Sequence, residues 1–229
     1  MRDIAGRDVA YMFGLGFVVP LIVGVAGMLA HLLLHNVVWS ILGVSVAMII
    51  VALVVWSFAR RGWTRHDFGF QPLGPRGWHL VWQIPAGLIV SLVIAATVGA
   101  ILNLQPEQEQ PSTGLESFIP PDNILLGYIV VFFFAVIAGP IWEELVFRRF
   151  IMGWLDYRWN KPAISIGVSA LLFAAIHMVP AIVVWTFLLG VWGAVLVRWH
   201  RSLWAGVAYH VFNNFLVTVG MGIALLTAA

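Results

Sequence analysis

Long apolar stretches separated by short polar ones dominate the chain. Seven of them approach the ~20 residues that an α-helix needs to cross a bilayer. They cover residues 9–34, 37–59, 79–104, 123–147, 162–177, 181–198 and 202–226. The fifth and sixth are short, so the number of crossings stays open between six and eight. The pattern predicts an all-α integral membrane protein, a polytopic helical bundle of about seven transmembrane helices.

Composition supports the membrane assignment. The 229 residues are 62% hydrophobic and 10% charged, with a mean hydropathy of +0.97, whereas soluble domains are about 25% charged. A formal net charge of only +2 gives no indication of a nucleic-acid partner. The chain has no cysteine, which excludes disulfides, thiol catalysis and thiolate metal sites.

Basic residues occupy alternate connections between the apolar stretches. They are Arg2 and Arg7, then Arg60, Arg61, Arg65 and Arg76, then Arg148, Arg149, Arg158 and Lys161, and finally Arg198 and Arg201. The intervening connections contain no lysine or arginine, and the longest of them, 105–122, is acidic. The positive-inside rule therefore predicts a cytoplasmic N-terminus and an outer C-terminus.

We expect one structural unit with two parts. Residues 1–122 would form three N-terminal transmembrane helices with a cytoplasmic connector and an outer loop. Residues 123–229 would form a four-helix core that carries the chemistry. With a single lysine and this compact architecture, we interpret the protein as a multi-pass protein of a prokaryotic plasma membrane.

Adjacent acids and arginines end the fourth apolar stretch, where ionisable groups are costly and usually functional. Glu143 and Glu144 point about 100° apart on a helix, whereas Glu144 and Arg148 are four residues apart and can pair. We infer that Arg148 holds Glu144 while Glu143 projects towards other helices as a base. Arg149 is expected to reach the interface by snorkelling. The alternative is a purely structural ion-pair network of these four charges.

Further polar residues on later helices favour a shared site. Phe173 and His177 share a helix face, as do His210 and Asn214 on the last helix, with Tyr209 and Asn213 rotated by one residue. The depth of these residues in the membrane does not fit a shared site equally well. Counted at the rise of an α-helix from the nearest basic residue, Glu143 lies only about 7.5 Å inside Arg148, whereas His177 lies about 24 Å beyond Lys161. The two side chains would then lie at different depths.

The three motifs together, Glu143-Glu144-x-x-x-Arg148, Phe173-x-x-x-His177 and His210-x-x-x-Asn214, resemble the signature of the CAAX-protease and bacteriocin-processing (CPBP, or ABI) family. Its members are intramembrane proteases related to type II CAAX prenyl endopeptidases. The resemblance covers about residues 124–220.

By this resemblance, Glu143 and His177 would activate a water, while His210 and Asn214 would stabilise the oxyanion. Glu144, Arg148 and Phe173 would support them. A zinc-dependent version would instead use Glu143, His177 and His210 as ligands, a recognised catalytic set. We favour the version without a cofactor, because asparagine is a poor zinc ligand and suits an amide donor.

Three functions are compatible with these residues. The first is an intramembrane endopeptidase acting on a membrane-associated peptide or protein. The second is a membrane immunity or scaffold protein that binds a peptide without hydrolysing it. The third is a small transporter or proton-coupled channel, which the absence of paired broken helices disfavours. The sequence does not indicate the substrate, its prenylation or the oligomeric state.

Overall fold

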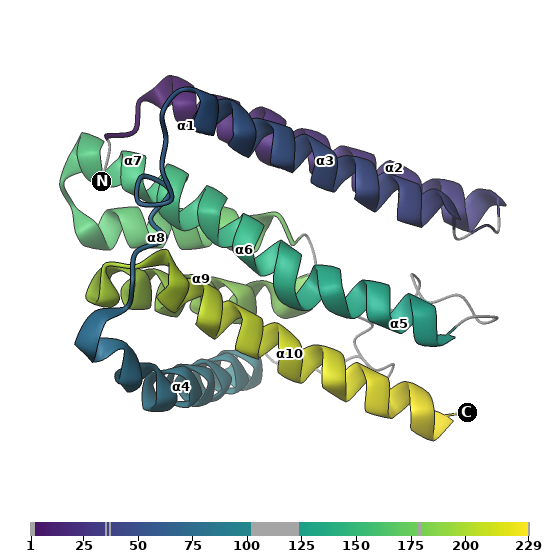
Figure 1. Ribbon diagram of the computed structural model, residues 1–229. Coiled ribbons are helices and arrows are strands. Elements are labelled where there is room, and N and C mark those ends of the chain that lie inside the picture. The colour runs from purple at the N-terminus through teal and green to yellow at the C-terminus, as the bar shows by residue number, and fades with distance from the viewer. Residues whose placement is uncertain (1–2, 35, 37, 102–123, 178–179, 229) are drawn as a thin grey trace.

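The computed structural model describes residues 3–34, 36, 38–101, 124–177 and 180–228, and every regular element within these ranges is helical (Figure 1). The acidic segment 105–122 lies outside the described residues, so its assignment to an outer loop stays a prediction.

Six helical runs are long and apolar enough to cross a membrane. They are Gly6–Leu34, Val38–Arg60, Gly74–Ile101, Gly127–Trp159, Ile182–His200 and Leu203–Ala224. The remaining apolar helix, α8 (Pro162–Ala175), has 14 residues and measures about 21 Å, less than the ~30 Å of hydrocarbon. The polytopic helical membrane protein is therefore confirmed, and the described chain has six such runs where the sequence indicated about seven.

The first two runs form an antiparallel pair. The first joins α1 (Gly6–Phe13), the π-helical segment η1 (Gly14–Val18) and α2 (Val19–Leu34), and it packs against α3 (Val38–Arg60). Gly27 and Gly43 meet where the helices cross, and a Cβ added to Gly27 would lie 2.7 Å from the Cα of Gly43. The third run consists of the short 3₁₀ helix η2 (Gly74–His79) followed by α4 (Leu80–Ile101).

The fourth run continues well beyond its predicted end. It begins within α5 (Ile124–Phe132) and continues through the π-helical segment η4 (Phe133–Ala138), α6 (Gly139–Glu144), the π-helical segment η5 (Leu145–Ile151) and α7 (Met152–Trp159). The prediction that it ends at residue 147, before a basic loop, is wrong. The helix stops only at Asn160, whose left-handed φ of 50° closes it, with the Asn160 N–H bonded to the Asp156 carbonyl.

Arg149 explains part of this difference. Its side chain does not snorkel: the residue is buried, and its Nε donates to the carbonyl of Asp67 in the connector after α3. Trp63 of the same connector stacks on Phe150. The connector therefore covers Arg149 with protein. Because its charge is satisfied there, the arginine does not mark the end of the helix.

The last three helices pack beside the fourth run. α8 packs on α9 (Pro180–His200), α9 packs on α4 and on α10 (Leu203–Ala228), and α10 lies along α6. The N-terminus, the connector after α3, and the α7–α8 and α9–α10 turns gather at one end of the bundle, opposite the C-terminus (Figure 1). The basic connections thus share one end, and the side of the membrane that this end faces stays a prediction.

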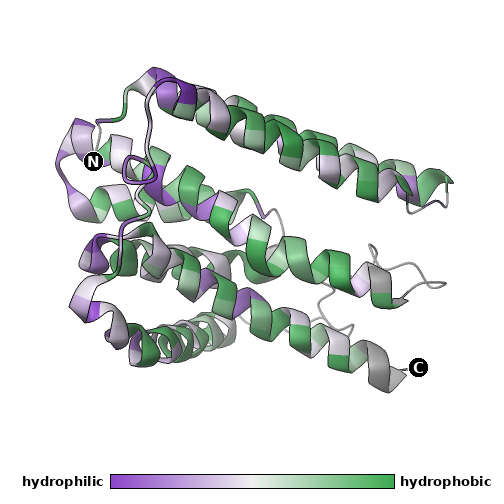
Figure 2. Ribbon diagram, in the orientation of Figure 1, coloured by the Kyte–Doolittle hydropathy of each residue, from purple (hydrophilic) through white to green (hydrophobic). Residues whose placement is uncertain are grey.

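Hydropathy along the ribbon distinguishes the α2–α3 pair from the helices α6 and α10 (Figure 2). The helices α2 and α3 are hydrophobic over most of their length, and many of their leucine, isoleucine and valine side chains are exposed, as expected of a surface in contact with lipid. Hydrophilic positions interrupt α6 and α10 within the bundle (Figure 2). The interruption on these two neighbouring helices marks the candidate site.

Candidate active site

A helical hairpin brings the second motif to the level of the first. Because the fourth run extends to Trp159, Glu143 lies 17 residues before Asn160 and His177 lies 17 residues after it. Phe147 and Phe173, each 13 residues from the same turn, pack edge to face with ring centroids 5.4 Å apart. The depth difficulty disappears because the turn of the hairpin is at residue 160 rather than beside Arg148.

Glu144 and Arg148 form the predicted ion pair. Arg148 Nε lies 3.3 Å from Glu144 Oε2, and both side chains are 1% exposed. The guanidinium also stacks over Phe173 at 4.4 Å and donates through Nη2 to the Gly190 carbonyl, 3.4 Å away. Breaking a buried pair by removing one partner typically destabilises by about 3–5 kcal/mol, so this pair is a structural requirement of the site.

His210 of α10 lies between the two glutamates. Its Nδ1 is 3.2 Å from Glu144 Oε1, and its Nε2 is 3.7 Å from Glu143 Oε2. The inference that only Glu143 reaches another helix is therefore wrong, because neighbouring residues 100° apart can flank one facing helix from both sides. Glu143 remains the accessible carboxylate, with 22% of its side chain exposed.

His177 follows the end of α8 and has a defined ring orientation. Its Nδ1 lies 2.8 Å from the Phe173 carbonyl. A carbonyl oxygen can only accept, so this bond requires the proton on Nδ1 and leaves Nε2 as an acceptor in the neutral ring. The rings of His177 and His210 both contact Phe173 edge to face, at 4.9 and 5.5 Å between centroids. Phe173 thus links the second motif to the third.

A π-helical turn and a proline position Asn214. The N–H of Gly139 bonds to the Phe134 carbonyl, five residues back, and the next residue, Pro140, has no N–H. The carbonyl of Ala135 therefore lacks its usual backbone donor, and Asn214 Nδ2 donates to it at 2.7 Å. Glycine is required at 139, where an added Cβ would lie 2.9 Å from the Phe134 oxygen. π-Helical turns are frequent at functional sites.

The two residues beside the third motif have separate structural roles. Asn213 donates through Nδ2 to Asn214 Oδ1 at 2.9 Å, so both ends of the Asn214 amide are oriented. Tyr209 is fully buried within the core of the bundle. The Tyr209–Asn213 face predicted as a second pair therefore supports the site rather than joining it.

A glycine on α10 makes room for a buried charge. A Cβ added to Gly206 would lie 2.5 Å from Glu144 Oε2, whereas one added to Gly193 of α9 would make only ordinary contact with Arg148 Nη2, at 3.6 Å. Small residues let helices approach closely in membranes. At Gly206 the space is filled by a carboxylate, a role that the sequence pattern of small residues does not reveal.

The zinc alternative fits this arrangement poorly. It needs Glu143, His177 and His210 around one ion, but the part of the chain that the structure describes contains no group of three or more histidine, aspartate or glutamate side chains placed to hold a metal. We therefore derive no step through a metal.

The fold and the site define a polytopic membrane protein with a buried Glu–Arg pair, two histidines and an asparagine on neighbouring helices. The family match is consistent with this description: residues 125–216 match the family described as "Type II CAAX prenyl endopeptidase Rce1-like". The predicted resemblance is confirmed for this segment, which contains all three motifs. Comparison with curated proteins and with solved structures gives no significant match.

Proposed function

We propose that this protein is an intramembrane endopeptidase that hydrolyses a membrane-associated peptide or protein, in a prokaryotic plasma membrane and with its N-terminus in the cytoplasm. The family of residues 125–216 comprises CAAX-type intramembrane proteases and related proteins. The observation that carries the proposal is the contrast between two adjacent carboxylates. Glu144 is buried and paired, whereas Glu143 is partly exposed beside His210.

Glu143 and His177 are proposed to activate the attacking water. The Nε2 of His177, an acceptor when Nδ1 donates to Phe173, would accept a hydrogen bond from one O–H of the water and orient it. The carboxylate of Glu143 would take the proton as the water oxygen attacks the scissile carbonyl carbon. That proton would then pass from Glu143 to the leaving amine as the C–N bond breaks. General-base catalysis of this kind contributes roughly 10²–10⁴-fold.

Asn214 and His210 are proposed to hold the oxyanion. Asn214 gives one N–H to the Ala135 carbonyl, and its second N–H would donate to the developing negative charge. His210 Nδ1 lies 3.2 Å from Glu144 Oε1. Donation to the oxyanion through Nε2, with Nδ1–H bonded to Glu144, requires a proton on each ring nitrogen. One oxyanion donor is typically worth about 2.7–4 kcal/mol.

The Glu143→Gln substitution tests the central assignment. The amide keeps the size of the side chain but cannot take a proton, so hydrolysis of a reporter peptide should fall by about 10²–10⁴-fold with an unchanged Tm in detergent. Asp3→Asn, at an exposed carboxylate near the N-terminus, serves as the charge-matched control. Undiminished cleavage by the Glu143→Gln variant would show that the assignment is wrong.

Two further measurements separate the alternatives. Wild-type protein that binds the reporter peptide but never cleaves it would favour the non-catalytic scaffold. Activity that a chelator removes and Zn²⁺ restores would favour the zinc version, and we expect neither. Reporter peptides with and without a prenyl group, and membrane-peptide profiles of cells carrying wild type or Glu143→Gln, would define the substrate class.

A further inference from the structure

A cavity of about 310 Å³ lies at the basic end of the bundle, between α7, the end of α9, the start of α10 and Gly69 of the connector. Four arginines and a single carboxylate make up its charged lining: Arg148, Arg149, Arg198, Arg201 and Asp156. Asp156 is ion-paired with Arg198. The remaining positive charge predicts a preference for anions.

Two guanidiniums in this lining have buried nitrogen atoms that no hydrogen-bond acceptor among the described residues satisfies. These atoms are Nε and Nη1 of Arg148 and Nε of Arg198, and of the three Arg148 Nε lies 3.3 Å from Glu144 Oε2 in the ion pair. Arg148 is 1% exposed and uses its other nitrogens on Glu144 and Gly190. A buried donor without an acceptor costs about 1–3 kcal/mol, and more when it is charged. A ligand with several acceptor oxygens would remove this cost at both arginines.

The shape of the cavity is maintained by glycine. Gly69 has a left-handed φ of +88°, and its carbonyl accepts the N–H of Leu203 at 2.8 Å, which fastens the connector to α10. A Cβ added to Gly153 would lie 3.1 Å from Arg149 Nη1. Arg201 itself has a φ of 54°, a conformation that is uncommon for residues other than glycine, so the turn places an arginine where glycine would be less strained.

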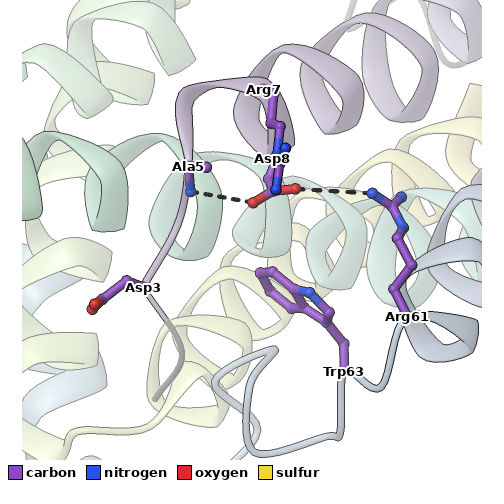
Figure 3. A pocket seen from close by; sticks show the side chains of 6 residues that line it. All are labelled: Asp3, Ala5, Arg7, Asp8, Arg61 and Trp63. Atoms are coloured by element: carbon purple, nitrogen blue, oxygen red, sulfur yellow. Dashed lines mark hydrogen bonds and ion pairs between the residues drawn. The ribbon is translucent and has the colours of Figure 1, made fainter.

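A second pocket at the same end provides a contrast (Figure 3). It is lined by Asp3, Asp8, Arg7 and Arg61 among others, and Asp8 lies 3.9 Å from Arg61 while also accepting the Ala5 N–H (Figure 3). Charges of both signs balance there. The cavity beside Arg148 differs because its four arginines are balanced by two carboxylates, Asp156 paired with Arg198 and Glu144 paired with Arg148, so a net positive charge remains that favours a negative ligand.

We propose that the cavity lined by Arg148, Arg149, Arg198 and Arg201 binds a phosphate group, either of an anionic lipid headgroup or as free phosphate. Arginine forks match the geometry of phosphate oxygens. The volume of 310 Å³ accommodates a phosphate and several waters, each of which occupies ~30 Å³. The location fits as well, since this end carries the basic connections that the positive-inside rule places at a membrane surface.

The proposed phosphate site is linked to Glu144 because both involve Arg148. Arg148 lines the cavity and pairs with Glu144 at 3.3 Å, and Glu144 contacts His210 at 3.2 Å. A bound phosphate would therefore draw on the same guanidinium that holds Glu144. Binding itself does not depend on hydrolysis, so it can be measured whether or not the proposed protease activity exists.

Binding is tested on the full chain in a neutral detergent by titrating inorganic phosphate or a short-chain phosphatidylglycerol at constant ionic strength and following Tm. A ligand of the folded state raises Tm in a saturable manner. We expect Arg201→Gln to weaken the apparent affinity at least tenfold. Arg7→Gln, at an exposed arginine of the other pocket, should leave it unchanged.

The double variant Arg198→Gln/Asp156→Asn removes an ion pair without changing the net charge, and it should also weaken binding at least tenfold. A response to both ligands would support a general phosphate site, whereas a response to phosphatidylglycerol alone would support a lipid headgroup. The proposal is overturned if neither ligand raises Tm, or if Arg201→Gln and the double variant respond as the wild type does.

Discussion

In the α2–α3 pair, glycine lets two backbones touch, whereas between α6 and α10 it makes room for a charge. Gly27 and Gly43 face each other's Cα atoms across an apolar interface, but Gly206 faces the carboxylate of Glu144. The same small residue therefore supports lipid-facing scaffold in one region and buried chemistry in the other. If this distinction holds, substitutions in the first region should change stability alone, and those in the second should also change activity.

The largest stability effect is expected at the buried ion pair. Arg148→Met would leave Glu144 buried without its partner, and the free energy of unfolding in detergent should fall by about 3–5 kcal/mol. The double variant Glu144→Leu/Arg148→Met should recover most of that loss, since apolar replacement of a buried pair is often neutral. A single variant as stable as the wild type would contradict the assigned pairing.

Gly206→Ala should lower both the stability of the protein and its cleavage activity. The new methyl group would meet Glu144 Oε2 at 2.5 Å and Val197 Cγ2 at 2.7 Å, and overpacking typically costs about 1–3 kcal/mol. Because the carboxylate is held by Arg148 and His210, its displacement should reduce reporter cleavage at least tenfold per folded molecule. Unchanged cleavage would mean that the position of Glu144 does not matter to catalysis.

Gly43→Ala is the matched substitution in the scaffold. Its methyl group would lie 2.8 Å from the Cα of Gly27 and 3.1 Å from the Val23 carbonyl, so the helices must separate, again at about 1–3 kcal/mol. Cleavage per folded molecule should match the wild type. A loss of activity as large as that of Gly206→Ala, measured at equal folded fractions, would remove the distinction between the two regions.

The smallest effect is expected at Ser169. Its hydroxyl donates to the Phe147 carbonyl at 2.8 Å and ties α8 to η5. Ser169→Ala should lower the free energy of unfolding by about 1 kcal/mol, the typical net value of one hydrogen bond. Thermal unfolding measures this directly, and cleavage should remain within about twofold of the wild type.

Local spacing allowed several features to be predicted from the sequence. The Glu144–Arg148 pair and the shared face of Phe173 and His177 depend on helical periodicity within one segment, and both are present. Six of the seven apolar stretches form helical runs long enough to cross a membrane, and the fifth forms the shorter helix α8. One available signal was missed. Pro140 lacks an N–H, so a preceding carbonyl had to find another donor, and Asn214 supplies it.

The sequence by itself determined a polytopic helical membrane protein and the set of candidate site residues, because hydropathy and i, i+4 spacing are local properties. Tertiary structure alone decided that the helix continues past Arg149, since the connector around Asp67 covers that arginine. It also decided that His210 contacts Glu144 as well as Glu143. Such contacts depend on how distant helices pack, which no local pattern specifies.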